Sequence, residues 1–203
     1  MVTDAVIVVV GYLVGSIPFG VVVVRLARGE DIRAHGSGNI GASNVWRTYG
    51  RSLGIPVALL DVVKGLVPAL VGLEVGGEWV GVLAGAAAMA GHARPVWLRF
   101  AKGGKMVATA GGVSFALAPV AAALCLLVWV ATFALFRYAS LASLVTAVAL
   151  PALSLLLGEP WPTVALALAA CAGVIVLHRE NIRRLLDGSE SRFSRSRRPT
   201  ASA

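Results

Sequence analysis

Charged side chains are scarce in this sequence, since Asp, Glu, Lys and Arg together make up 14% of its 203 residues. Hydrophobic residues make up 58%, and the mean hydropathy is +0.82. A water-soluble domain of this length needs a much larger polar surface than these residues can provide. The shortage of charge therefore excludes an ordinary soluble domain and indicates a membrane protein.

Cysteine is also scarce. Cys125 and Cys171 both fall inside apolar stretches, and we interpret them as small buried hydrophobic residues rather than a disulfide or a nucleophile. The polar loops lack a dense group of carboxylates, and neither cysteine can join a histidine there, so we expect no metal site and no cofactor. The GxxxxGK[ST] motif is missing as well, which excludes a P-loop nucleotide site. We expect no nucleic-acid partner.

Long apolar runs are abundant by contrast, and several reach the roughly 18 residues needed to cross a hydrocarbon core about 30 Å thick. A transmembrane β-barrel would instead show alternating segments of roughly ten residues. We therefore predict an all-α polytopic membrane protein. The apolar spans lie near residues 5–26, 53–73, 79–91, 106–118, 119–136, 140–157 and 160–177.

Hydropathy alone leaves open whether residues 106–136 cross the membrane once or turn back near Pro119. The basic residues distinguish these alternatives, because Lys and Arg collect on the cytoplasmic side. With a turn near Pro119 there are seven spans, and every Lys and Arg except Lys64 falls on one side, whereas a single crossing would export the arginine-rich tail. We therefore predict seven transmembrane helices, with the N-terminus outside and the C-terminus cytoplasmic.

Small residues recur in the spans at the four-residue spacing that lets helix backbones approach closely. Gly11 with Gly15, and Gly81 with Gly85, form such pairs, which we interpret as packing sites. From residue 188 onward the chain is rich in Ser and Arg. We predict one integral-membrane domain over residues 1–190 and a basic, disordered cytoplasmic tail over residues 191–203 that lies against anionic lipid headgroups.

Three polar clusters interrupt the apolar pattern, and the predicted topology places all of them on the cytoplasmic face. They are RAHGSGNIGASNVWRTYG (33–50), GHARPVWLRFAKGGKMVAT (91–109) and HRENIRRLLDGSE (178–190). All three histidines of the protein, His35, His92 and His178, lie in or beside these clusters. This common location indicates a shared site.

The first two clusters combine glycine with basic residues, which suits the binding of an anion. Glycine permits positive φ and close backbone approach, so that several N–H groups can point at one anion. Arginine adds a planar fork that fits phosphate oxygens. Lys102-Gly103-Gly104-Lys105 directly precedes an apolar run, so these glycines would open a helix whose N-terminus attracts anions. The simpler alternative is two ordinary positive-inside loops, which need charge but neither glycine nor asparagine.

The third cluster places His178, Asn181 and Arg184 on one helical face, because they follow each other at intervals of three. His178 could act as a general acid–base group or as a neutral donor to phosphate. Asp61 and Lys64 are also three apart, within the second span, where an ionisable pair is costly unless it is paired or lines a polar cavity. This pair could support the cytoplasmic site, or it could be a purely structural salt bridge, and the sequence leaves both alternatives open.

Four motifs, taken in order, resemble those of the bacterial acyl-phosphate:glycerol-3-phosphate acyltransferases, the PlsY family. They are SIPFG (16–20), GSGNIGASNVWR (36–47), GHARPVWLRFAKGGKMVAT (91–109) and HRENIRRLLDGSE (178–190). The resemblance implies a seven-span enzyme of the bacterial inner membrane, surrounded by lipid. Such an enzyme moves a fatty acyl group from acyl phosphate to the 1-hydroxyl of glycerol 3-phosphate. Lysophosphatidic acid and phosphate leave, and phospholipid synthesis begins; acyl-chain preference and oligomeric state stay open.

The resemblance also implies the site residues. The expected catalytic residues are Ser37, Arg47, Lys105, His178 and Asn181. The expected substrate-binding residues are Gly38, Asn39, Asn44, His92, Lys102, Gly103, Gly104 and Thr109. Of these, Gly38, Asn44 and His92 are expected from their place in the polar clusters rather than from the resemblance. The family usually reads FKGGKG where this chain has Ala101 and Met106, so the glycine-rich loop departs from the family pattern at its first and last positions.

Acyl phosphate is an activated mixed anhydride, so we expect catalysis by positioning and electrostatic stabilisation rather than through a covalent acyl-enzyme. No Ser–His–Asp pattern surrounds Ser37, which argues against an acylated serine. The proton could pass to His178 or to a substrate phosphate. The main alternative is a small membrane transporter or channel for organic phosphate. The one-sided polar clusters and the lack of an internal repeat argue against it.

Overall fold

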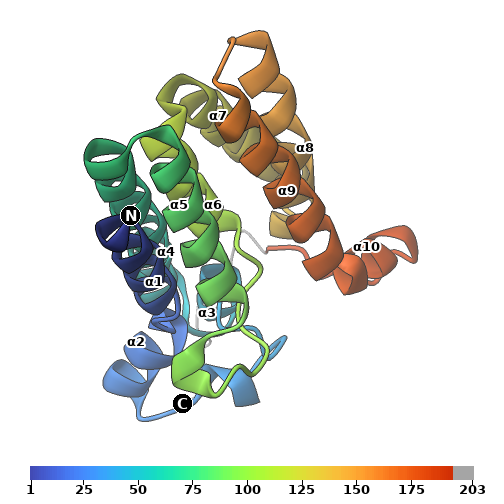
Figure 1. The fold of residues 1–203 in the computed structure, drawn as a ribbon. Coiled ribbons are helices and arrows are strands. Elements are labelled where there is room, and N and C mark those ends of the chain that lie inside the picture. Colours follow the sequence, from blue (N-terminus) through green and yellow to red (C-terminus); the bar gives the residue numbers. More distant parts are fainter. Residues whose placement is uncertain (194–203) are drawn as a thin grey trace, which may run out of the picture.

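A computed structural model describes residues 1–193, and within that range every regular element is a helix (Figure 1). The N-terminal part contains α1 (Val2–Gly15), α2 (Phe19–Arg28), η1 (Ile32–Ala34), α3 (Ala42–Tyr49), α4 (Arg51–Gly76), α5 (Glu78–Ala93) and η2 (Val96–Leu98). The C-terminal part contains α6 (Val107–Leu117), α7 (Pro119–Phe136), α8 (Ala139–Leu156), α9 (Trp161–Leu177) and α10 (Arg179–Leu186).

Within residues 1–193, four segments are long and apolar enough to cross a membrane: Val2–Arg28, α4, α7 and α8. The bent pair of α9 and α10, with 61° between its helices, would be a fifth. With 16 and 11 residues, α5 and α6 are shorter than the roughly 20 residues of a typical spanning helix. The prediction of an all-helical membrane protein is thus confirmed, and each of the seven expected apolar spans is helical.

The chain breaks between α6 and α7, at the place where the sequence allowed either a continuous span or a turn. Ala118 has φ −144° and ψ 67°, which is not helical, and Pro119 starts the next helix. Proline fits this position, because the first residue of a helix needs no N–H partner. Beyond the break, α7 leaves α6 and packs on α8 (Figure 1).

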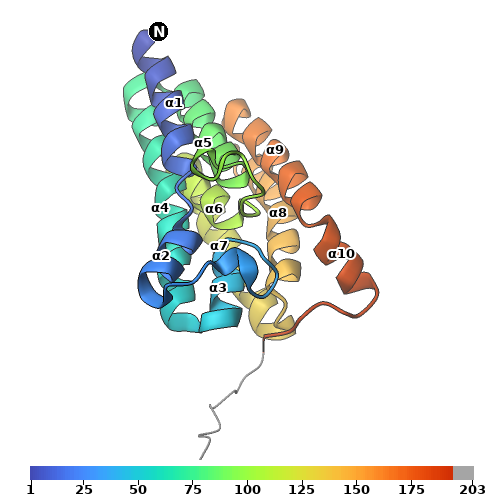
Figure 2. The same cartoon turned by 90° about the horizontal axis from the view of Figure 1, so that it is seen from below.

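The helices form two groups (Figures 1 and 2). In the first, α4 packs against α1, α5 and α6, and α1 also packs against α5. In the second, α8 packs between α7 and α9. Contacts of α9 with α5 and α6 join the groups, around a core that includes Met89, Val113 and Ala170.

The two glycine pairs lie at helix crossings, as predicted. A Cβ atom at Gly11 would lie 2.8 Å from the Ala84 carbonyl oxygen, and one at Gly15 would lie 2.5 Å from the Cα atom of Ala88. Gly81 faces the backbone of α4, and Gly85 faces Val113 of α6. These positions hold α1, α4, α5 and α6 closer together than larger side chains would allow.

The first apolar span is interrupted at residues 16–18. Helix α1 ends at Gly15, and Pro18, which is not helical, directly precedes α2. Beyond this break, Val21 and Val24 of α2 pack with Ile32, Ile40 and Val45 in a second apolar cluster. This cluster anchors the glycine-rich loop that follows α2. The break in the first span therefore helps to position the loop.

Candidate active site

A cavity of about 390 Å³ lies between the two groups of helices. Its wall is mostly apolar and comes from α6, α7, α8 and α9. The residues of this wall include Val107, Gly111, Phe115, Ala122, Leu126, Trp129, Ala147, Leu150 and Val174. A long apolar ligand could therefore lie along these helices.

Polar residues gather at one end of the cavity, and all of them except Asp61 of α4 come from the three clusters of the sequence. They are Ser37, Asn39, Ser43, Asn44, Arg47, Asp61, His92, Lys105, His178, Asn181, Arg184 and Glu190. All five expected catalytic residues belong to this set. Of the expected substrate-binding residues, Asn39, Asn44 and His92 belong to it.

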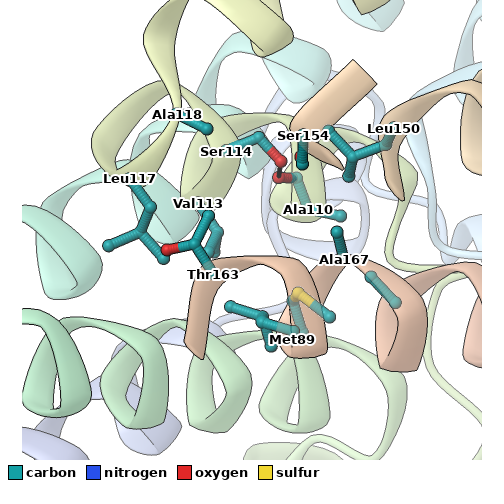
Figure 3. A pocket seen from close by; sticks show the side chains of 12 residues that line it. Met89, Ala110, Val113, Ser114, Leu117, Ala118, Leu150, Ser154, Thr163 and Ala167 are labelled. Atoms are coloured by element: carbon teal, nitrogen blue, oxygen red, sulfur yellow. Dashed lines mark hydrogen bonds between the residues drawn. The ribbon is translucent and has the colours of Figure 1, made fainter. Parts of the chain in front are cut away.

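A smaller cavity of about 20 Å³ adjoins the larger one (Figure 3). The two share Ala110, Ser114, Leu150 and Ala170 as lining residues. Leu117 and Ala118, at the end of α6 far from Lys105, also line the smaller cavity. The lining residues of the two cavities follow α6 from Val107 to Leu117. A helix of 11 residues is about 16 Å long, so the apolar region extends about that far from the polar end.

Two asparagines hold the loop that joins η1 to α3. The Asn44 side chain donates to the carbonyl oxygens of His35 (3.1 Å) and Asn39 (2.9 Å), and it accepts from the Ser37 N–H (2.9 Å). Asn39 accepts from the Gly41 N–H (2.8 Å) and donates to the Gly103 carbonyl oxygen (3.3 Å). Their amide groups are thus engaged with backbone, so both residues shape the loop and join it to the second cluster.

The loop brings Ser37 and the first turn of α3 to the cavity. Gly38 has φ 69° and, unlike its neighbours Ser37 and Asn39, is not among the residues that line the cavity. Residues 41–43 line the cavity where α3 begins, and the free N–H groups at a helix start attract anions. The loop therefore presents a hydroxyl and a helix N-terminus to the cavity.

The second cluster differs from the expected phosphate cradle. The N–H groups of Gly103 and Gly104 donate to the carbonyl oxygens of Ala93 and His92, each at 3.0 Å, so they are not directed at a ligand. A Cβ atom at Gly104 would collide with the His92 imidazole. These glycines instead allow the loop to pack tightly over His92, and neither lines the cavity.

Lys102 and Thr109 also lie away from the cavity. Lys102 is exposed and pairs with Glu180 at 3.4 Å. Thr109 is fully buried where α6 crosses α4, with its carbonyl group against Gly65. Of the expected site residues Lys102, Gly103, Gly104, Lys105 and Thr109, only Lys105 lines the cavity.

Lys105 belongs to a hydrogen-bonded network. Its ammonium group donates to Asn181 Oδ1, and Asn181 Nδ2 donates to Glu190 Oε1 at 2.7 Å. Glu190 also accepts from Ser140 at 2.6 Å and from Arg184 at 2.7 Å. Burial acts to raise the pKa of Glu190, but these hydrogen bonds outweigh it and keep the pKa below its usual value. The carboxylate therefore stays charged and holds the basic residues in place.

Burial shifts the pKa values of two groups at the polar end. It lowers the pKa of Lys105 to about 8, with a further contribution from the positive charge of Arg184. It also lowers the pKa of His178 to about 4, helped by the charge of Lys105. His178 Nδ1 lies 2.9 Å from the Val174 carbonyl oxygen, which can only accept, so Nδ1 carries the hydrogen. The neutral imidazole then has its lone pair on Nε2.

Asp61, Lys64 and His92 form a buried polar group beside the cavity. Lys64 lies 2.8 Å from Asp61 Oδ1, and both side chains are 2% exposed. His92 Nδ1 lies 3.6 Å from the same oxygen. Lys64 also donates to the Ile17 carbonyl oxygen at 2.8 Å, in the break of the first span. The pair thus supports the helix break, while Asp61 and His92 also line the cavity.

Sequence reasoning did not place Ser43, Arg184, Glu190 or Phe193 among the site residues. Glu190 closes the third motif, and an acidic residue at the end of a segment with three arginines is a signal that could have found it. Phe193 lies beyond the expected domain boundary at residue 190, yet it packs against Trp46 and Phe133. Residues 194–203 of the expected tail lie outside the described range.

The fold and the cavity together define the class of the protein. It is an integral membrane protein whose helices enclose an apolar cavity with a basic, polar end. A cavity of this kind suits a ligand that combines an acyl chain with a phosphate group.

Comparison with known proteins gives the particular family. The chain matches the glycerol-3-phosphate acyltransferase family over residues 5–188 and belongs to it. The glycerol-3-phosphate acyltransferase of Desulforudis audaxviator is 49% identical over 192 residues, which cover 94% of this chain and 96% of that protein. The one from Aquifex aeolicus is 44% identical over 189 residues, covering 92% of this chain and 97% of that protein.

Two solved structures show the same fold. Both are crystal structures of PlsY, an integral membrane glycerol 3-phosphate acyltransferase. The glycerol 3-phosphate form has a TM-score of 0.91 at 43% identity, and the lysophosphatidic acid form has a TM-score of 0.87 at 41% identity. Each comparison covers 95% of this chain and 96% of the other chain.

Proposed function

We propose that this protein transfers a fatty acyl group from acyl phosphate to the 1-hydroxyl of glycerol 3-phosphate. The products are lysophosphatidic acid and inorganic phosphate. Family membership supports this function. The observation that carries the site is the convergence of Ser37, Arg47, Lys105, His178 and Asn181 on one end of an apolar cavity.

The two parts of the cavity suit the two parts of acyl phosphate. The acyl chain lies in the apolar region between α6 and α9, and its phosphate lies at the polar end. Glycerol 3-phosphate enters beside it. Arg47, Ser37 and Lys105 bind phosphate oxygens, and Asn181 holds Lys105 in place. These residues thereby stabilise the charge that develops on the departing phosphate.

In the reaction, the 1-hydroxyl oxygen of glycerol 3-phosphate forms a bond to the acyl carbon. The bond between that carbon and the phosphate oxygen breaks, and phosphate leaves with the electron pair. The hydroxyl proton passes to a phosphate oxygen. Because acyl phosphate is already activated, Ser37 acts as a binding group and no acyl-enzyme forms.

The environment of His178 favours a substrate phosphate as the base. With a pKa of about 4, His178 is a weak base at neutral pH, whereas a phosphate monoester has its second pKa near about 6. The fixed Nδ1 hydrogen leaves Nε2 free to accept a hydrogen bond from the substrate hydroxyl. His178 therefore orients the hydroxyl.

We also propose the finer membrane arrangement. The protein has seven spans in a bacterial inner membrane, with the N-terminus outside and the site on the cytoplasmic side. The basic loops that surround the polar end support this orientation. After replacement of Cys125 and Cys171 by Ala, an impermeant thiol reagent should label Asp4→Cys in intact spheroplasts. It should label Gly188→Cys only after permeabilisation, and the reverse pattern would contradict the orientation.

The activity itself is tested with the purified protein, acyl phosphate and labelled glycerol 3-phosphate. We expect lysophosphatidic acid and phosphate to form. Arg47→Ala should lower kcat/KM at least about tenfold, as expected for the loss of a charged group that hydrogen-bonds a substrate phosphate. His178→Ala should lower kcat, and the exposed Arg28→Ala serves as control. A folded wild type that releases no phosphate would disprove the reaction, and uptake of organic phosphate by proteoliposomes would favour a transporter.

A further inference from the structure

The chain after α10 crosses the polar end of the cavity and packs on the opposite side. Its first anchor is Glu190, which binds Asn181, Arg184 and Ser140. Its second is Phe193, whose N–H donates to the Arg137 carbonyl oxygen at 2.9 Å, while the Arg137 guanidinium donates to the Phe193 carbonyl oxygen. The match to the family ends at residue 188, so this segment, Ser189–Phe193, lies beyond it.

The ring of Phe193 completes an aromatic cluster between α3 and α7. It meets Trp46 edge to face at a centroid distance of 5.8 Å, and Phe133 at 5.2 Å. Phe133 in turn stacks on Trp129 at 5.1 Å. Such arrangements are attractive, so the ring of Phe193 has a defined position and orientation.

Arg47 lies on this ring. Its guanidinium carbon is 4.8 Å from the centroid of Phe193. The Arg47 side chain is exposed and lines the cavity, and partial desolvation there lowers its pKa without removing its charge at neutral pH. A guanidinium stacked by its face on an aromatic ring keeps the N–H groups of its edge for hydrogen bonds. The ring thus restricts the side chain without competing for its donors.

We propose that Phe193 is a positioning residue for the reaction, which acts by holding the Arg47 guanidinium with its N–H edge toward the substrate phosphate. The segment Ser189–Phe193 is thus part of the site. This inference rests on the proposed function, because it requires Arg47 to bind a substrate phosphate. A ring that only fills space between α3 and α7 would stabilise the fold without acting on Arg47.

A double-mutant cycle with Arg47→Ala separates these roles. Phe193→Leu keeps an apolar side chain but removes the aromatic face, and Phe193→Tyr keeps the face. We expect Phe193→Leu to cause an increase of about three- to tenfold in one KM, that of the substrate whose phosphate Arg47 binds. The kcat and the Tm should change little. Phe193→Tyr should restore the KM. In the Arg47→Ala background, Phe193→Leu should have no further effect on it.

Arg192→Ala is the matched control, because it changes the adjacent residue, which stacks on Tyr138 at 5.0 Å, and leaves Arg47 untouched. Equal effects of Phe193→Leu with and without Arg47, or an unchanged KM, would overturn the inference. The same double-mutant cycle can be measured without turnover, from the Kd of each variant for glycerol 3-phosphate and for inorganic phosphate. If the wild-type protein binds these ligands but forms no lysophosphatidic acid, the result contradicts the proposed reaction and leaves the role of Phe193 to be decided by the binding cycle.

Discussion

Lys105 shows how burial and hydrogen bonding act together on a single residue of the site. Asn181 accepts a hydrogen bond from its ammonium group, and Glu190 holds Asn181 in turn. Burial lowers the pKa of Lys105 to about 8. A lysine in this state holds its charge less firmly than an exposed one, although a bound phosphate would favour the charged form.

This pKa predicts the pH dependence of the enzyme. Below about pH 8 Lys105 is protonated and binds phosphate, and above it the charge is lost. We therefore expect kcat/KM to fall as pH rises through about 8, since glycerol 3-phosphate is already a dianion there. Lys105→Arg should remove this decline, because arginine stays charged across the range. The same decline in Lys105→Arg would show that another group titrates.

Met106 has a backbone conformation that is unfavourable for a residue with a side chain. It has φ 65°, the left-handed conformation that favours glycine, at the position where the family usually has glycine. Its side chain is buried, and its end lies beside Gly173. The side chain thus packs α6 against α9 despite an unfavourable backbone conformation.

Two substitutions separate the side chain of Met106 from its backbone. Met106→Gly and Met106→Ala both remove the buried side chain, but only alanine retains a Cβ atom at positive φ. We expect Met106→Gly to be more stable than Met106→Ala by about 0.5 kcal/mol, after allowance for the greater freedom of glycine in the unfolded chain. Thermal unfolding in detergent measures the difference. Equal stability, or a more stable Met106→Ala, would show that the backbone is relaxed.

Among the helices, backbone contact between α1 and α5 depends on glycine. Gly11 and Gly15 face Ala84 and Ala88, and side chains at the glycines would enter the α5 backbone. Lipid supplies no hydrophobic force between helices, so this close packing is a main source of their association.

Gly15→Leu should separate α1 from α5 and lower the free energy of unfolding by about 1–3 kcal/mol. Gly111→Ala is the control, because a Cβ atom at Gly111 has nothing within 4 Å. It should leave stability unchanged or slightly higher. Thermal unfolding of the two variants measures this contrast. Equal Tm values would argue against the α1–α5 contact.

At the scale of the whole molecule, residues from both groups of helices line the cavity. Figures 1 and 2 show how the two groups lie beside each other. The first group supplies the glycine-rich loops and α6, and the second supplies the apolar wall, His178 and Asn181. The smaller cavity at the far end of α6 extends the apolar region (Figure 3).

This shape predicts a test of where the acyl chain lies. Gly111 lines the larger cavity and faces open space, so Gly111→Leu fills the cavity without striking the backbone. Displacing about two methylene groups should lower kcat/KM for hexadecanoyl phosphate relative to octanoyl phosphate by about tenfold. Ala123→Leu, on the exposed face of α7, should leave the ratio unchanged. An unchanged ratio in Gly111→Leu would place the chain elsewhere.

The sequence by itself determined the helical elements and indicated part of the site. Apolar runs produce helices because backbone polar groups in lipid must pair within their own segment, and Pro119 marked a break that the structure contains. Three separate polar motifs indicated a common site, and Ser37, Arg47, Lys105, His178 and Asn181 do line one cavity.

Only the tertiary structure decided what each site residue does. The N–H groups of Gly103 and Gly104 bond to residues 92 and 93, Asn44 holds its own loop, and Asn181 holds Lys105. Phe193 reaches Arg47 across 146 residues of chain. Composition and spacing report which groups are present, but the partner of a hydrogen bond depends on where helices cross. That geometry arises from the packing of side chains distant in sequence.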